Sequence, residues 1–101
     1  MRNKDLDVKL VLKLATEGHP SFYSIFKKVY PEFNSKLRSL APSLNPEDMA
    51  VCAYTRLGFR TLQIAYYRKT TIRAIESRKY RIRKRINIPK QEDFMKHISE
   101  L

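Results

Sequence analysis

The sequence predicts one small all-α domain, and three observations support this fold class. The chain has 101 residues, enough for a single hydrophobic core, and only 2 glycines, so few positions favour a helix break. Hydrophobic residues make up 43% of the chain, and they recur at intervals of three and four residues, as on one face of a helix. Alternating Val and Thr runs, which favour strands, do not occur in the sequence. We therefore expect helices throughout.

The first part of the chain is expected to form three short helices. Leucines at every fourth position predict a helix over about residues 4–17, and Gly18 is a suitable stop. Prolines delimit the next two helices, because proline is tolerated in a first helical turn and not in a helix interior. The second helix should run from Pro20 to Pro31, and the third should end before Pro42.

The firmest helix start lies at residues 45–48, with the sequence Asn-Pro-Glu-Asp. Asn is a favoured N-cap, Pro suits the first helical position, and two acids favour the positive end of the helix dipole. This helix should end at Gly58, which can take the left-handed conformation of a C-terminal cap. Its expected inner stripe consists of Met49, Cys52, Ala53 and Leu57.

Two further helices and a tight turn follow. Thr61 is the expected cap of a short helix, and Thr71 is the expected cap of a longer basic helix, with the turn at about residues 68–71. Pro89 separates a last amphipathic segment over residues 91–101. The apolar residues that share a face of this segment are Phe94, Ile98 and Leu101.

The positive charge of the chain is concentrated in one segment. Residues 60–90 hold eleven of the 21 Lys and Arg residues, and Glu76 is the only acid there. Eleven positive charges and one negative charge give this segment +10 of the net +11 of the chain. A polyanion gains affinity for such a segment through the release of counterions. The charge distribution therefore predicts a nucleic-acid partner.

The basic helix has an apolar and a polar side. On a helical wheel Ile75, Ile82 and Ile86 lie together, with Ile72 at the edge, and they form the expected buried stripe. The other side can enter a major groove, where polar side chains reach base edges and Arg and Lys reach phosphates. This polar side carries Arg73, Ser77, Tyr80 and Lys84, flanked by Glu76 and Arg81.

Several short signatures, found in order along the chain, carry a family resemblance. The run Leu-Asn-Pro-Glu-Asp at residues 44–48 and the following stretch to Ile-Ala at residues 64–65 resemble the opening of LuxR/GerE-type helix-turn-helix domains. Tyr-Pro-Glu-Phe at residues 30–33 and the runs at residues 52–58 and 80–85 look like the C-terminal output domains of Bacteroidetes transcriptional regulators.

The resemblance implies a helix-turn-helix bundle of the LuxR/GerE type with extra N-terminal helices. Residues 1–29 would be a helical arm or linker remnant, and residues 30–101 would be the DNA-binding domain, with its recognition helix at about residues 72–86 in the major groove. The base-reading positions implied by the resemblance are Glu76, Ser77 and Tyr80. The candidates for contacts to the DNA backbone are Arg60, Thr61, Arg73, Lys79, Arg83 and Lys84.

Two positions near the turn differ from the usual pattern of this family. Arg68 and Thr70 occupy turn positions that are usually apolar. Either Tyr66, Tyr67 or the aliphatic stem of Arg68 substitutes for the missing apolar contact, or the turn is loose. After the basic helix, Asn87 stands in place of a frequent glycine and can adopt the same left-handed conformation.

The apolar stripe of the last segment allows two arrangements. By resemblance, Phe94, Ile98 and Leu101 belong to a dimerisation helix and pair across a two-fold axis when two subunits occupy adjacent half-sites on DNA. Alternatively, the stripe packs back onto Met49 and Leu57 of the same chain.

Other functional classes find little support in the sequence. The two histidines lie near opposite ends of the chain, and no glycine-rich phosphate loop or cluster of metal ligands occurs, so we expect no enzyme, cofactor or metal. The single Cys52 excludes an intrachain disulfide and suits a reducing cytoplasm. The apolar run at residues 10–14 is too short and charged to span a membrane, so we expect a cytoplasmic protein without a membrane partner.

The expected function is therefore sequence-specific binding of double-stranded DNA by a transcriptional regulator. Two alternatives remain open. The arginine-rich helix could bind structured RNA, or the chain could be a degenerate output domain that now serves as a protein-interaction piece. No sensor or receiver module occurs in these residues, so an input signal would come from an upstream sensor or receiver protein.

Overall fold

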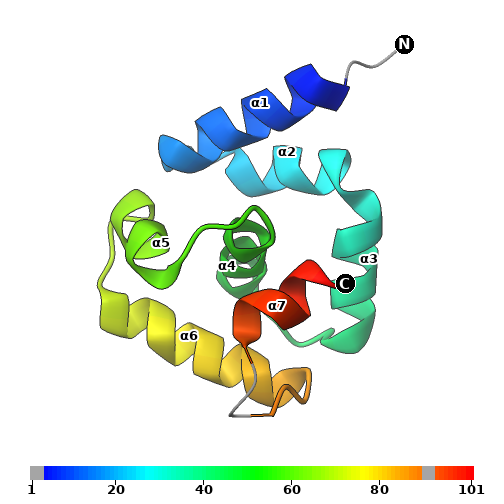
Figure 1. The fold of residues 1–101 in the computed structure, drawn as a ribbon, viewed down its shortest axis with the longest axis vertical. Helices are drawn as coiled ribbons and strands as arrows, with labels where there is room; N and C mark the ends of the chain where they lie inside the picture. The colour runs from blue at the N-terminus through cyan, green and yellow to red at the C-terminus, as the bar shows by residue number, and fades with distance from the viewer. Residues whose placement is uncertain (1–3, 90–92) are drawn as a thin grey trace.

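The computed structural model describes residues 4–89 and 93–101, and within these ranges it contains seven helices and no strand. The prediction of an all-α chain is confirmed. None of the described helices combines the length and the apolar character that crossing a membrane requires. In chain order the helices are α1 (Lys4–Thr16), α2 (Phe22–Val29), α3 (Pro31–Leu40), α4 (Pro46–Arg56), α5 (Thr61–Tyr67), α6 (Ile72–Arg85) and α7 (Phe94–Ser99) (Figure 1).

Helix α4 is the centre of the bundle. It packs against α2, α6 and α7, and Figure 1 shows α1 and α6 at opposite ends of the molecule with α4 between them. All residues from Asp48 to Thr55 are buried. The sequence predicted a single inner stripe on this helix, but a helix that neighbours cover on every side buries its whole circumference.

The N-terminal helices share one hydrophobic core with the rest of the chain. The rings of Phe22 on α2 and Tyr54 on α4 lie with their centroids 4.4 Å apart. The Tyr54 hydroxyl donates a buried hydrogen bond of 2.7 Å to the carbonyl oxygen of Ala15 on α1. The described part of the expected arm over residues 1–29 is therefore no detached unit, because its apolar side chains complete the core around α4.

Helices α4 and α6 begin at the predicted caps. The side chain of Asn45 accepts a hydrogen bond of 2.8 Å from the backbone N–H of Asp48, and the Asp48 carboxylate accepts one of 3.3 Å from the N–H of Asn45. At α6 the hydroxyl of Thr71 accepts a hydrogen bond of 3.0 Å from the N–H of Ala74. These bonds satisfy N–H groups that have no partner within their own helix.

The predicted cap of α5 is wrong by one residue. Arg60 is the N-cap, and Thr61 is the first helical residue. The side-chain oxygen of Gln63 accepts a hydrogen bond of 2.9 Å from the N–H of Arg60. Gln63 therefore supplies the acceptor at this helix start, and no cap by the Thr61 hydroxyl is required.

Four helices end with the same hydrogen-bonded turn, the Schellman motif. In each of them, the N–H two residues beyond the C-cap donates to the carbonyl oxygen of the third-last helical residue. The prediction of a left-handed residue is confirmed for Gly58 and Asn87, and Gly18, which was predicted as a helix stop, is left-handed as well. The left-handed residues after α1, α4, α5 and α6 are Gly18, Gly58, Lys69 and Asn87.

Helix α7 closes the core against α4. Phe94 and Ile98 are buried there, and Leu101 is partly buried against the same cluster. In this structure the stripe packs back onto its own chain, as in the alternative arrangement. The dimerisation role of Phe94, Ile98 and Leu101 on DNA stays a prediction. Residues 91 and 92, at the start of this expected segment, lie outside the described ranges.

Replacing Ile98 with Ala should lower the free energy of unfolding by about 2–4 kcal/mol, because the shorter side chain leaves a cavity between α7 and α4. Leu40→Ala is the matched control. Leu40 on α3 is 52% exposed, so this substitution should change stability by less than about 0.5 kcal/mol. Urea unfolding followed by circular dichroism measures both effects. Equal effects of the two substitutions would show that α7 is not part of the core.

Candidate nucleic-acid interface

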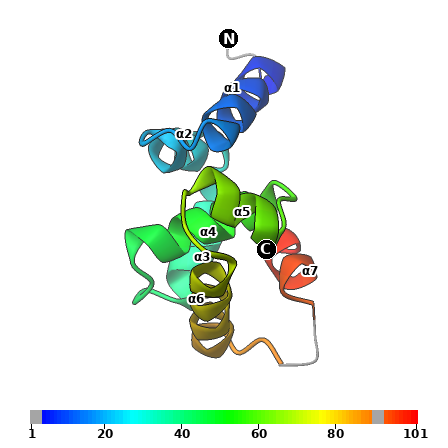
Figure 2. The ribbon, with the colours of Figure 1, turned by 90° about the vertical axis from the view of Figure 1, so that its left-hand side faces the viewer.

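Helices α5 and α6 pack against each other and are joined by a short turn, on the side of the molecule that faces the reader in Figure 2. Lys69 in this turn has a φ of 54°, which costs a residue other than glycine about 1 kcal/mol. The hydrogen bond of 2.9 Å from the N–H of Thr70 to the carbonyl oxygen of Ala65 holds this conformation.

An aromatic ring and an ion pair pack the turn against α4. The ring of Tyr67 is stacked on that of Tyr54, with centroids 6.5 Å apart. Arg68 donates two hydrogen bonds, of 2.9 and 2.6 Å, to the carboxylate of Glu47 at the start of α4. Tyr67 and Arg68 therefore pack the turn against α4, whereas Tyr66 is 79% exposed. The turn is well packed.

The carboxylate of Asp48 joins α6 to the start of α4. Its side chain is only 4% exposed, and it accepts hydrogen bonds of 3.0 Å from Arg78 and 2.8 Å from Arg81. Burial acts to raise the pKa of Asp48, but the hydrogen bonds from Arg81, Arg78 and the backbone of Asn45 outweigh it and hold the pKa below its usual value. Asp48 is therefore ionised at neutral pH and neutralises positive charge on α6.

Lys79 and Thr61 bind each other. The Lys79 ammonium is half-buried, donates a hydrogen bond of 2.7 Å to the Thr61 hydroxyl and lies 5.4 Å from the centre of the Phe94 ring. Burial, and then the charges of Arg83 and Arg60, lower the pKa of Lys79. Both Lys79 and Thr61 were expected on the DNA backbone. In this structure their polar groups tie α6 to the start of α5, and their role on the DNA backbone stays a prediction.

Two more arginines of α6 contact neighbouring segments. The Arg83 guanidinium lies 5.5 Å from the centre of the Phe94 ring and donates a hydrogen bond of 3.2 Å to the carbonyl oxygen of Pro89. Arg85 donates a hydrogen bond to the hydroxyl of Ser43, which precedes α4. Arg83, which was also expected to contact the DNA backbone, is half-buried where α6 meets α7.

One side of α6 keeps its polar side chains exposed, as the helical wheel predicts. Four residues lie on this side, and they are spaced four, three and four positions apart. They therefore follow one line along the helix over about 16 Å. The Lys84 ammonium lies 4.6 Å from the centre of the Tyr80 ring, and Tyr80 is 57% exposed. Glu76 is exposed beside the line. The residues of this line, called the exposed α6 line below, are Arg73, Ser77, Tyr80 and Lys84.

The centre of the buried side of α6 also agrees with the helical wheel. Ile75 and Ile82 are buried against α4 and its neighbours, and Ile86 is partly buried. Ile72, which the wheel put at the edge of the stripe, is 44% exposed. The apolar side thus fixes which side of α6 faces solvent.

The basic side chains that remain for a partner are fewer than the sequence indicates. Glu47 and Asp48 of α4 pair with Arg68, Arg78 and Arg81, so two acids offset two of these three positive charges. Sequence reasoning missed these pairs, because it interpreted Glu47 and Asp48 only as acids of a first helical turn. Within the part of the chain that the structure describes, the exposed cations of α5, the turn and α6 without an acidic partner include Arg60, Lys69, Arg73 and Lys84.

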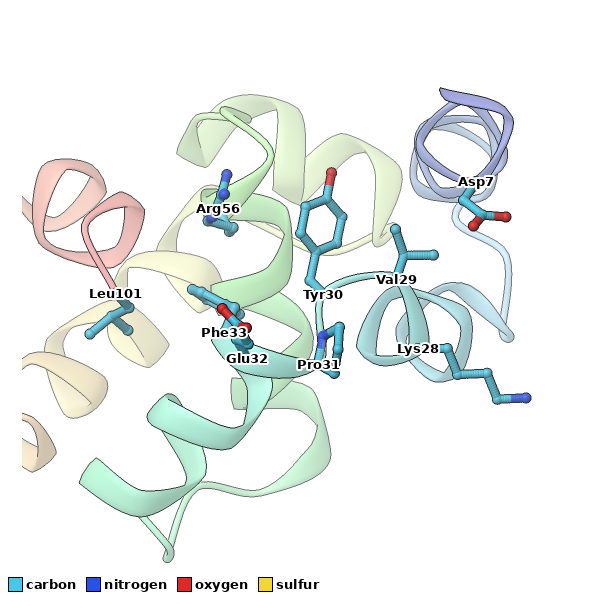
Figure 3. Close-up of a pocket in the computed structure, with 9 residues that line it drawn as sticks. All are labelled: Asp7, Lys28, Val29, Tyr30, Pro31, Glu32, Phe33, Arg56 and Leu101. Atoms are coloured by element: carbon cyan, nitrogen blue, oxygen red, sulfur yellow. The ribbon is translucent and has the colours of Figure 1, made fainter. Parts of the chain in front are cut away.

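A separate pocket of about 540 Å³ lies at the junction of α2 and α3 (Figure 3). The Arg56 guanidinium lies 5.4 Å from the centre of the Tyr30 ring at this pocket. Two acids and two cations line it, so no net charge favours one class of ligand, and no lining residue comes from α5 or α6. The lining residues are Asp7, Lys28, Val29, Tyr30, Pro31, Glu32, Phe33, Arg56 and Leu101.

Cys52 lies inside the core, where burial raises the pKa of its thiol to about 12. The thiol is therefore protonated at neutral pH. Over residues 4–89 and 93–101, no three His, Cys, Asp or Glu side chains come together in a way that could hold a metal ion.

The fold and this surface define an all-helical protein with a basic helix, α6, exposed along one side and fixed to the central helix by a buried acid. Comparisons of the chain with protein-family models, with curated proteins and with solved structures found no match. The resemblance to LuxR/GerE domains therefore stays a prediction.

Replacing Asp48 with Asn should lower the free energy of unfolding at neutral pH by about 1–3 kcal/mol, because Arg78 and Arg81 lose a buried, charged acceptor. The folded protein lowers the pKa of Asp48. Its stabilising effect is therefore complete above the ordinary Asp pKa of about 3.9 and is lost as the pH falls through the lower folded value.

The stability difference between wild type and Asp48→Asn should consequently shrink between about pH 5 and pH 2. Urea unfolding at a series of pH values measures it. A difference that stays constant over this range would contradict the proposed ion pairing.

Proposed function

We propose that the protein binds double-stranded DNA sequence-specifically, as a transcriptional regulator, with α6 in the major groove. The exposed α6 line is the observation that carries this proposal. It presents two cations, a hydroxyl and a tyrosine along one side of a helix whose other side is buried. The major groove is about 12 Å wide and admits one α-helix, so the middle of such a line can reach base edges.

The side chains of the line suit different parts of the duplex. Ser77 and Tyr80 occupy its middle, where a helix in the groove comes closest to base edges, and Glu76 beside them can accept a hydrogen bond from the amino group of cytosine. Arg73 and Lys84 stand near its two ends and suit phosphates on either side of the groove.

Helices α4, α5 and α6 would then form a helix-turn-helix of the LuxR/GerE type. The close packing of α5 on α6 and the well-packed turn between them support this proposal. Arg60, at the start of α5, and Lys69, in the turn, are exposed and would extend the phosphate contacts beyond α6.

The affinity for duplex DNA should depend strongly on salt. If about four phosphates are neutralised per chain, the logarithm of the binding constant should fall with the logarithm of the salt concentration at a slope of about −4. Fluorescence anisotropy with a labelled duplex at several salt concentrations measures this slope. A slope near zero would reject the proposal, and tighter binding of an RNA hairpin at matched salt would favour an RNA partner.

The choice of sequence should depend on the middle of the exposed α6 line. Ser77→Ala and Tyr80→Ala should each cost about 1–3 kcal/mol on the preferred site, identified by selection from a random duplex pool, with little effect on random DNA. Lys84→Ala is the matched control, since loss of a phosphate contact should weaken binding to both DNAs about equally. If both alanine variants keep the sequence preference, Ser77 and Tyr80 are not the readers. Weak binding without any preference would favour a protein-interaction role.

A further inference from the structure

Asp48 lies close to the surface proposed for DNA and yet is buried under two arginines. Of the two, Arg81 is the more exposed, with 44% of its side chain accessible compared with 30% for Arg78. We propose that Asp48 is a specificity-determining residue that keeps Arg81 from DNA phosphates and so limits sequence-independent binding. This inference rests on the proposed function.

The position of Arg81 on α6 makes it the relevant arginine. At 100° per residue it lies about 70° around the helix from the exposed α6 line, on the flank where a groove wall would run. Arg78 lies about 130° away from the same line, towards α4, and is too far behind the helix to meet a phosphate. Removal of the carboxylate would therefore release one phosphate-binding group, Arg81.

A phosphate and Asp48 would compete for the same guanidinium. The carboxylate is already desolvated and accepts hydrogen bonds from Arg78, Arg81 and the backbone of Asn45. If Arg81 moved to a phosphate, the buried charge would keep only part of these hydrogen bonds, and burial of a charge with fewer partners is costly. Arg81 therefore stays on Asp48 when the protein meets DNA.

The consequence is a higher ratio of specific to non-specific affinity. Sequence-independent binding comes from neutralised phosphates, whereas base edges supply the preference for one site. An arginine held by an internal acid adds nothing to binding at the many competing sites of a genome. Stability alone is a weak reason for this cluster, since replacing buried ion pairs by apolar residues is often neutral or stabilising.

The salt dependence of binding to a random duplex tests the inference. Arg81→Gln in the wild-type background should leave the slope unchanged, since Asp48 already keeps Arg81 from DNA phosphates. Asp48→Asn should make the slope steeper by about 1 and raise the affinity several-fold at low salt. Adding Arg81→Gln to Asp48→Asn should restore the wild-type slope. The matched control, Arg78→Gln in the Asp48→Asn background, should keep the steeper slope.

Three results would overturn the inference. A shallower slope for Arg81→Gln alone would mean that Arg81 already contacts a phosphate. An unchanged slope for a folded Asp48→Asn variant would mean that Asp48 does not keep Arg81 from DNA phosphates. Failure of the wild type to bind any duplex would refute the proposed function and this inference together.

If Asp48→Asn proves unfolded by circular dichroism, Arg81→Gln and Arg73→Gln decide the question. Arg78 still pairs with Asp48 in Arg81→Gln, so this variant keeps one arginine on the carboxylate. A slope reduced by about 1 in Arg73→Gln and unchanged in Arg81→Gln supports the inference. Equal reductions in the two variants overturn it.

Discussion

The position of α6 depends on the buried carboxylate of Asp48. This residue accepts hydrogen bonds from two arginines of α6 and, as part of a capping box with Asn45, fixes the start of the central helix. The positive end of the α4 dipole and the two guanidinium groups together stabilise the charge. A rotation of α6 against α4 would separate the charge from its partners, so Asp48 acts together with the buried Ile75 and Ile82 to hold the orientation of α6.

The fold divides the basic side chains into structural and exposed ones. Arg68, Arg78 and Arg81 are held by acids of α4, and Lys79 bridges α6 to the start of α5. The net charge of the segment therefore overstates what a polyanion would meet. The exposed cations without an acidic partner include Arg73 and Lys84 on one side of α6 and Arg60 and Lys69 at the two ends of α5, and these support the proposal of a nucleic-acid partner.

The core takes apolar side chains from both ends of the chain. A small domain buries a limited fraction of its surface, so a central helix such as α4 needs neighbours on every side. Phe22 from α2 and Ile98 from α7 both reach this core. This need explains why apolar side chains of the N-terminal helices and of α7 are buried in the same core as α4.

The sequence by itself determined the local features of this protein. The caps at Asn45 and Thr71, the left-handed Asn87 and the exposed side of α6 follow from contacts within about four residues, which helical periodicity and cap preferences describe. Only the tertiary structure decided which residues pair across the fold. The hydrogen bonds from Lys79 to Thr61 and from Arg81 to Asp48 join positions 18 and 33 residues apart. Periodicity indicates that a side of a helix is apolar or basic, but the packing of distant segments determines what covers it.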